Sequence, residues 1–354
     1  MSATIKDGKL CFSVFGRGYE DTRVDSGEGV IDDYNRYGIA VNGASFDVTG
    51  QYLWLGSIGN DPSKGLLKYD MDDDFNQIVH NVPTSAVETV MLHASNVANN
   101  YGLAVQYGGD WFVFDMTDDT VIANGNNATL ATKIAWSTQG YDCILDGTKF
   151  RIIHYLTSNG SPEVVTLDYS SGTVTTQVVG NPRSGGTFIS ENLIYLYYAP
   201  QWFYQYKYIE AKTSSDVQIW GNQATSGGSD GFGGMDLMGI GRKGQLITPT
   251  NFYSAWRMGV YNGTRTPDFE TPKPIRVFGK FESQPTIKSF VFSHEKARFA
   301  FNCDLGIFVS DFEDIEKISD ITERVYAVSD NYVVAEMGRL DAGHLHSIGV
   351  FKYR

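Results

Sequence analysis

The chain has 354 residues, of which 42% are hydrophobic and 19% charged, and its formal net charge is −13. This composition is typical of a folded globular protein and excludes a disordered one. The negative charge repels phosphate backbones and anionic lipid headgroups, and no apolar run reaches the roughly 18 residues of a membrane span, so we expect no nucleic-acid partner and no membrane insertion.

The first strand-like segment is KLCFSVF, residues 9–15, and it belongs to no complete unit of its own. From about residue 40 a pattern recurs: an apolar strand, a turn of Gly, Asp, Asn or Ser, a second apolar strand, and a third strand that often ends in an aromatic-Asp pair. The first copy is SFDVTGQYLWLGS, with Thr49-Gly50 at its turn. In this hairpin, Leu53 and Leu55 should face away from Tyr52 and Trp54, because successive strand residues point to opposite faces.

The first strong apolar residue after each such turn marks seven repeat units, with anchors at Leu53, Leu103, Phe150, Ile194, Leu246, Phe299 and Val333. The distance from first to last is 280 residues over six steps, about 47 residues per step. A period of about 40 to 50 residues with short strands suits one four-stranded sheet per unit.

On these repeats the chain resembles the β-propeller superfamily from about residue 40 to residue 354. It lacks the WD-repeat and kelch signatures, so the resemblance concerns the architecture and names no subfamily. It implies an all-β fold, a single β-propeller domain spanning residues 1–354, with seven four-stranded blades near 40–85, 86–130, 131–181, 182–222, 235–280, 285–320 and 323–354.

The last unit lacks a fourth strand, so we expect residues 9–15 to pair with GVFKYR at the end of the chain and close the ring. A β-sandwich, a solenoid or two smaller β domains are the alternatives, because they also consist of short strands at regular spacing. Helix content should be very low. Only residues 311–321, DFEDIEKISDI, have a helix-like charge pattern, and we expect a strand or one turn there. We interpret Asn127-Ala-Thr129 as an Asn-rich turn.

Two acidic clusters, YDMDDDF at 69–75 and DMTDDT at 115–120, occupy equivalent positions after third strands. Calcium favours several oxygen ligands on one short loop, but neither cluster has the spacing of a calcium-binding loop. Asp-rich turns are stabilised by bonds from the carboxylate to the backbone. We therefore predict turns at both clusters, and no metal or cofactor.

No recognisable catalytic set is present. The sequence has no Gly-x-Ser-x-Gly motif and no sialidase-type Asp box, and its six histidines are scattered. The pair His344 and His346 could share one strand face, but a metal site would need further ligands. The Gly-rich segment 226–241 lacks the Lys-Ser/Thr ending of a phosphate-binding loop, so we interpret it as a connecting loop. The prediction is a protein that is not an enzyme.

Aromatic residues are concentrated in residues 195–208, YLYYAPQWFYQYKY. In the expected strand 202–208, four rings alternate with other residues and so share one face: Trp202, Tyr204, Tyr206 and Tyr208. If these rings lie between blades, they fill the space there and contribute to packing. If they lie exposed at the rim, they are suited to stacking on a sugar or to contacting a protein. The candidate contact residues for a protein partner or a glycan are Tyr197, Tyr198 and Trp202.

These features favour a non-enzymatic structural or interaction scaffold. Within that class we expect a phage virion component of the tail, nozzle or adsorption apparatus, which binds protein partners in a larger assembly through its faces and loops. The reasons for this expectation are free thiols, no visible secretion signal and an Asn-, Gly- and Tyr-rich β chain. We expect the protein to be located in the virion, or otherwise in the cytoplasm. The alternatives are a carbohydrate-binding propeller that contacts a surface glycan, and a glycan-cleaving propeller enzyme.

Overall fold

The computed structural model describes most of the chain in separate stretches. Its described residues are 4–6, 9–13, 40–58, 65–73, 76–85, 88–95, 99–135, 141–154, 163–179, 184–190, 193–198, 202–207, 217–223, 239–240, 246–252, 255–261, 275–293, 297–339 and 346–353. For residues 4–13 and 184–240 the description covers the backbone only.

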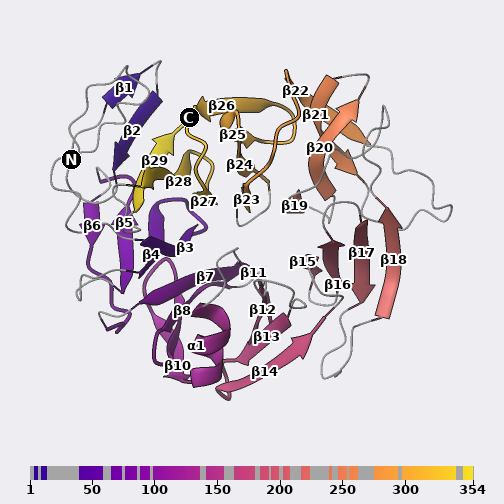
Figure 1. Ribbon diagram of the computed structural model, residues 1–354. Coiled ribbons are helices and arrows are strands. Elements are labelled where there is room, and N and C mark those ends of the chain that lie inside the picture. Colours follow the sequence, from indigo (N-terminus) through magenta and orange to yellow (C-terminus); the bar gives the residue numbers. More distant parts are fainter. Residues whose placement is uncertain are drawn as a thin grey trace.

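The described strands form seven antiparallel sheets, which are arranged in a ring (Figure 1). Sheet 1 contains β3 (Ala40–Phe46), β4 (Tyr52–Ile58), β5 (Leu66–Asp70) and β6 (Asn76–Ile78). Sheet 2 contains β7 (Thr89–Ser95), β8 (Asn100–Gln106), β9 (Asp110–Asp115) and β10 (Val121–Asn126). Sheet 3 contains β11 (Tyr141–Asp146), β12 (Lys149–His154), β13 (Glu163–Asp168) and β14 (Thr173–Val178).

The second half of the ring continues the same order. Sheet 4 contains β15 (Ser184–Ser190), β16 (Leu193–Tyr198), β17 (Trp202–Lys207) and β18 (Val217–Gln223). Sheet 5 contains β19 (Gly239–Ile240), β20 (Leu246–Phe252), β21 (Ala255–Tyr261) and β22 (Arg276–Phe281). Sheet 6 contains β23 (Ser289–Phe292), β24 (Phe299–Cys303), β25 (Gly306–Ser310) and β26 (Ile315–Ser319).

Sheet 7 combines the two ends of the chain. It contains β27 (Val325–Val328), β28 (Tyr332–Arg339), β29 (His346–Lys352), β2 (Lys9–Ser13) and β1 (Thr4–Lys6), in that spatial order. The N-terminal strand β2 lies antiparallel to β29, with Leu10 opposite Lys352 and Ser13 opposite Gly349. Of the expected pairing of residues 9–15, the structure describes the part from Leu10 to Ser13, and β1 adds a fifth strand outside β2.

The first strand of each sheet lies toward the centre of the ring, and the later strands lie progressively outward (Figure 1). Inner strands of neighbouring sheets touch: β3 contacts both β27 and β7, and β11 contacts both β7 and β15. This arrangement is a β-propeller, as the repeats predicted. All seven anchor residues lie in second strands, namely β4, β8, β12, β16, β20, β24 and β28.

Adjacent sheets are held together by apolar side chains that alternate along the strands. Leu53 and Leu55 on β4 pack in a cluster shared with sheet 7, whereas Trp54 between them packs against Phe114 of sheet 2, with ring centroids 4.7 Å apart. The expected alternation in the first hairpin is therefore confirmed. Full burial of side chains of this size contributes about 1.5 to 3 kcal/mol each, so these clusters are the main source of stability between sheets.

One helix occurs among the described residues and was not expected from the sequence. This helix, α1, spans Ala128–Ala135 in the connection from β10 to β11. The Oδ1 atom of Asn127 accepts a hydrogen bond from the Leu130 N–H at 3.1 Å, and Leu130 and Ile134 are fully buried. Reading Asn127-Ala-Thr129 as a simple turn was wrong, because Asn is a favoured N-cap and apolar residues four apart form a buried helix face.

The other helix-like segment, 311–321, behaves as expected. It forms a turn followed by the strand β26. The turn is closed by the Asp311 carboxylate, which accepts hydrogen bonds from the N–H groups of Glu313 and Asp314. Among the described residues, no helix is both long and apolar enough to cross a membrane.

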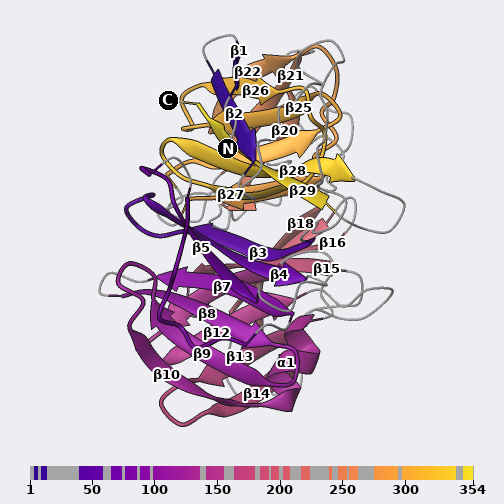
Figure 2. The same ribbon diagram turned by 90° about the vertical axis from the view of Figure 1, so that its left-hand side faces the viewer.

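The connections divide between the two sides of the ring. Because neighbouring strands are antiparallel, the turn after a first strand and the turn after a third strand leave each sheet on the same side, which we call the turn side. The connections after second and fourth strands, including the one with α1, lie on the opposite side. Figure 2 accordingly shows α1 and the C-terminus on opposite sides of the ring.

Candidate functional site

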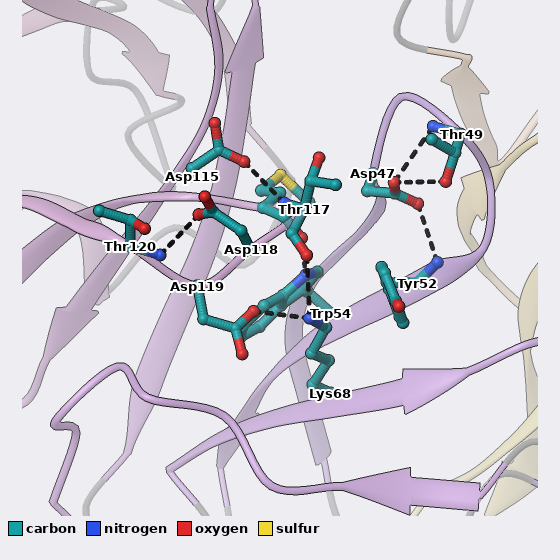
Figure 3. Close-up of polar contacts among 11 residues, drawn as sticks. Asp47, Thr49, Tyr52, Trp54, Lys68, Asp115, Thr117, Asp118, Asp119 and Thr120 are labelled. Atoms are coloured by element: carbon teal, nitrogen blue, oxygen red, sulfur yellow. Dashed lines mark hydrogen bonds and ion pairs between the residues drawn. The ribbon is translucent and has the colours of Figure 1, made fainter.

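The turn from β9 to β10, residues 115–120, is held in one conformation by its own carboxylates (Figure 3). Asp115 Oδ1 accepts a hydrogen bond from the Thr117 N–H at 2.8 Å, and Asp118 Oδ1 accepts one from the Thr120 N–H at 2.9 Å. The backbone N–H of Asp115 donates to the Thr120 carbonyl at 2.9 Å. This is the Asp-rich turn that the sequence predicted at DMTDDT.

The equivalent cluster at 69–75 is built in the same way. Asp70 Oδ1 accepts a hydrogen bond from the Asp72 N–H at 3.0 Å. In the part of the chain that the structure describes, no group of three or more His, Cys, Asp or Glu side chains could hold a metal ion. Asp70, Asp115 and Asp118 thus each accept a hydrogen bond from a backbone N–H group two residues further on, as Asp-rich turns do.

A buried ion pair ties the 115–120 turn to sheet 1. Lys68 on β5 places its Nζ atom 2.6 Å from Asp119 Oδ1, and the two side chains are only 4% and 9% exposed. The same ammonium group lies 3.4 Å from the Thr117 carbonyl oxygen. It also lies 3.9 Å from the centre of the Tyr52 ring, a distance at which an aromatic face attracts a cation.

A second contact between the sheets lies beside this ion pair. Trp54 on β4 donates its indole N–H to the Met116 carbonyl oxygen at 3.0 Å, and the Trp54 side chain is fully buried. Asp119 has a φ of 67°, a left-handed conformation that Asp tolerates better than most residues. The turn is thus held by its own carboxylates and by three polar contacts with Lys68 and Trp54 of sheet 1.

The charge states at the site follow from these contacts. Hydrogen bonds from the Thr120 backbone and side chain lower the pKa of Asp118, so this exposed carboxylate stays ionised. Loss of hydration, followed by the negative charges of Asp70 and Asp47, raises the pKa of Tyr52. Tyr52 therefore stays neutral and presents its ring to Lys68. The backbone N–H of Tyr52 donates to Asp47 Oδ1 at 2.8 Å, which holds this strand end in place.

The exposed part of the turn consists of Thr117, Asp118 and Thr120, while Asp119 between them is buried. The turn side of sheet 2 thus displays two hydroxyl groups and one carboxylate on a backbone that has little freedom to move. Such a group of side chains can donate and accept hydrogen bonds with a partner.

Sequence reasoning found the acidic cluster but missed Lys68, the residue that anchors it. The available signal was a single lysine inside the otherwise apolar strand LLKYD. A charged residue in a buried strand needs a partner of opposite charge. Which of the 41 acidic residues supplies that partner depends on the neighbouring sheet, and no spacing in the sequence reports it.

The three predicted contact residues, Tyr197, Tyr198 and Trp202, lie in sheet 4, where only the backbone is described. Tyr198 on β16 is directly opposite Trp202 on β17, whereas Tyr197 is opposite Phe203. Because residues opposite each other share a sheet face, Tyr198 and Trp202 occupy one face and Tyr197 the other. The structure therefore brings two of the three together. Their role in binding stays a prediction.

Other predicted features fall partly outside the described residues. Trp202, Tyr204 and Tyr206 lie in β17 and alternate along it, while Tyr208 is outside the described part. His344 is outside it as well, and His346 begins β29 opposite Arg339. Most of the Gly-rich segment 226–241 is also outside it, apart from β19.

A second, partly buried polar pair lies in sheet 7. The hydroxyl group of Tyr326 on β27 donates to Glu336 Oε2 at 3.2 Å, and the Arg324 guanidinium lies 5.3 Å from the centre of the Tyr326 ring. Burial, and then the negative charge of Glu336, raises the pKa of Tyr326 far above its ordinary value. The folded protein therefore keeps this phenol protonated at pH values where an unfolded chain would lose the proton.

We expect stability to fall at alkaline pH for this reason. Above about pH 10 the unfolded chain releases the Tyr326 proton and the folded chain retains it, so the free energy of unfolding decreases as pH rises, by up to about 1.4 kcal/mol per pH unit. Urea unfolding of the Tyr326→Phe variant between pH 8 and 11 should show a shallower decrease than the unchanged protein. Tyr107→Phe, at a residue 64% exposed, is the matched control. An unchanged slope in Tyr326→Phe would contradict this assignment.

The fold and site can be set against known proteins. No protein-family model and no curated protein matches this chain. Among solved structures, the β-propeller domain of Cps50 (Swd1) from Myceliophteria thermophila is similar, with a TM-score of 0.52 and 11% sequence identity over 89% of this chain and 96% of that one. This likeness shows the β-propeller fold.

Two Hsv2 structures are also similar. One is KlHsv2 with loop 6CD replaced by a Gly-Ser linker, with a TM-score of 0.44 and 12% identity over 84% of this chain and 89% of that one. The other is Hsv2 of Kluyvelomyces marxianus, with a TM-score of 0.42 and 12% identity over 84% of this chain and 88% of that one.

Proposed function

We propose that this protein is a non-enzymatic interaction scaffold that binds a protein partner through the turn side of sheets 1 and 2. The observation that carries the proposal is the preorganised 115–120 turn. Its backbone is fixed by Asp115, Asp118 and the buried Lys68–Asp119 pair, and it leaves Thr117 and Thr120 exposed beside an ionised carboxylate. A surface that is already ordered loses little conformational entropy on binding, so its contacts are converted efficiently into affinity.

The chemistry of the turn indicates the kind of partner surface that fits it. Asp118 stays ionised because hydrogen bonds lower its pKa, and exposed Asp72 and Asp73 lie on the same side of the neighbouring sheet. A partner surface that carries Lys or Arg side chains and hydrogen-bonding groups would complement it. Charge complementarity of this kind raises the association rate and is weakened by salt.

Site-specific photocrosslinking tests the proposal. A benzoyl-phenylalanine placed at Thr117 should give a light-dependent adduct with a partner protein when the chain is expressed in its native setting. The matched control is the same group at Thr129, an exposed residue on α1 on the opposite side of the ring. We expect Asp118→Asn, which keeps the acceptor oxygen for the Thr120 N–H, to reduce the yield at position 117. Equal adduct yields at both positions, or no adduct at Thr117, would contradict binding of a partner through the turn side.

The finer form of the proposal is that the assembly is a phage virion, with the chain in the tail, nozzle or adsorption apparatus. It is supported by the Asn-, Gly- and Tyr-rich composition of this β chain. The same crosslinked material separates this form from the general one. A chain and adduct that copurify with intact particles would support the virion role, and a chain absent from every purified particle would eliminate it while leaving the scaffold proposal in place.

A further inference from the structure

The outermost strand of each sheet presents an edge to solvent, and the protein protects these edges unequally. In the described part of the chain, β6 and β1 are only three residues long. Four others, β10, β18, β22 and β26, are interrupted by a shift of register in their pairing with the strand inside them. Short strands and bulges are devices by which native proteins prevent an edge from pairing with another chain.

The outer strand of sheet 3, β14, has none of these protections. It runs for six residues, TVTTQV, and all six pair with β13 in one unbroken register from Thr173 to Val178. It contains no charged residue, no proline and no glycine. In Figure 1 it lies at the outer rim of the ring, and no described strand lies beyond it.

Most side chains of β14 are exposed to solvent. Thr173, Thr175, Thr176 and Val178 are exposed, with Val178 at 43%. Thr and Val have high strand propensity, so the strand is well suited to further pairing. The same fold already accepts an extra outer strand elsewhere, because β1 pairs with β2 as the fifth strand of sheet 7. The edge of sheet 3 therefore has both the geometry and the composition of a strand-addition site.

We propose that β14 pairs with β14 of a second copy of this chain, joining the two third sheets into one continuous sheet across a two-fold axis. Two identical strands can pair antiparallel, and the axis then brings Thr175 and Thr176 close to the same residues of the second copy. In such a symmetric pair the residues nearest the axis face their own copies, so a charged residue there would be repelled by its counterpart.

Charge is the argument for a second copy as the occupant. On a protein with a net charge of −13, self-association requires a neutral contact region, and β14 provides one. By contrast, Lys317 lies at the centre of β26, so symmetric pairing of that edge would place two like charges on the axis. This inference is independent of the proposed partner on the turn side.

The test is the oligomeric state of the full chain, measured by light scattering after size-exclusion chromatography and by sedimentation equilibrium. We expect the unchanged protein to have twice the chain mass of 39.2 kDa. The double variant Thr175→Lys/Thr176→Lys should associate at least about 100-fold more weakly, because it places like charges across the axis. Thr132→Lys, the same change at an exposed residue of α1, is the matched control and should remain dimeric.

Hydrogen exchange of the β14 amides provides a readout that a folding defect does not imitate. In the unchanged protein, protection of residues 173–178 should increase with protein concentration, while protection of β13 should not. The double variant should lose this dependence and keep the protection of β13. A monomeric unchanged protein, a dimer that survives both lysines, or protection of β14 only when another protein is present would each overturn pairing with a second copy.

Discussion

Gly43→Ala is expected to destabilise the protein by about 4 kcal/mol or more, a large fraction of the stability of an ordinary domain, and so to lower the soluble yield at 37 °C. Gly43 lies on β3, the inner strand of sheet 1, with a φ of +96°. A Cβ atom added there would lie 2.0 Å from the carbonyl oxygen of Met91 on β7. The two inner strands approach so closely that one backbone must move, and packed interiors accommodate such movement poorly.

The comparison that isolates this clash is Gly108→Ala. Gly108 has a φ of +116°, but nothing lies within 4 Å of a Cβ atom added there. Its substitution should therefore cost only the strain of the backbone conformation, about 1 to 3 kcal/mol. Urea unfolding midpoints and soluble yields of the two variants would be compared directly. If Gly43→Ala were no worse than Gly108→Ala, the close approach of β3 and β7 would be wrong.

Asp119→Asn is expected to cost about 3 kcal/mol, because it leaves the Lys68 ammonium group buried without its counter-charge. Asn tolerates the left-handed conformation at this position, so the backbone of the turn should be retained. Lys68→Met should lower the free energy of unfolding by a similar amount, because it leaves the buried Asp119 carboxylate without a counter-charge. The measurement is the free energy of unfolding of each single variant and of the double variant.

The double variant Lys68→Met/Asp119→Asn should recover much of this loss. Replacing both members of a buried ion pair is commonly close to neutral, whereas removing one is severe. Asp118→Asn, the same chemical change at the exposed neighbouring residue, should alter stability by less than about 0.5 kcal/mol. If the stability losses of the two single variants simply add up in the double variant, Lys68 and Asp119 do not act as a pair.

The repeat could be predicted from the sequence because it depends on local chemistry. Turns of Asp, Asn and Gly separate short apolar strands, and the first apolar residue after each turn recurs every 44 to 53 residues, with a shorter last step of 34 residues. The seven anchors from Leu53 to Val333 all lie in second strands. The Asp-rich turns were predictable for the same reason, since an Asp carboxylate bonds to backbone N–H groups only two residues away.

The helix α1 was missed because its stability does not come from a long local pattern. Its eight residues are too few to form a stable helix alone. It exists because Leu130 and Ile134 pack against side chains of sheets 2 and 3, such as Val90 and Val165, which lie well beyond the helix itself along the chain. The N-cap at Asn127 could have indicated it, but the same residue is equally common in turns.

The amino-acid order alone thus decided the strand pattern, the repeat and the turn chemistry, because each involves residues within a few positions of one another. Tertiary structure decided everything that depends on two sheets meeting. Lys68 meets Asp119 across the gap between sheets 1 and 2, 51 positions apart in the chain. Likewise, strand pairing places Tyr197 on the other face of sheet 4 from Tyr198 and Trp202, and leaves β14 as an unbroken outer edge. Such contacts are selected by the packing of whole sheets, and no local spacing encodes them.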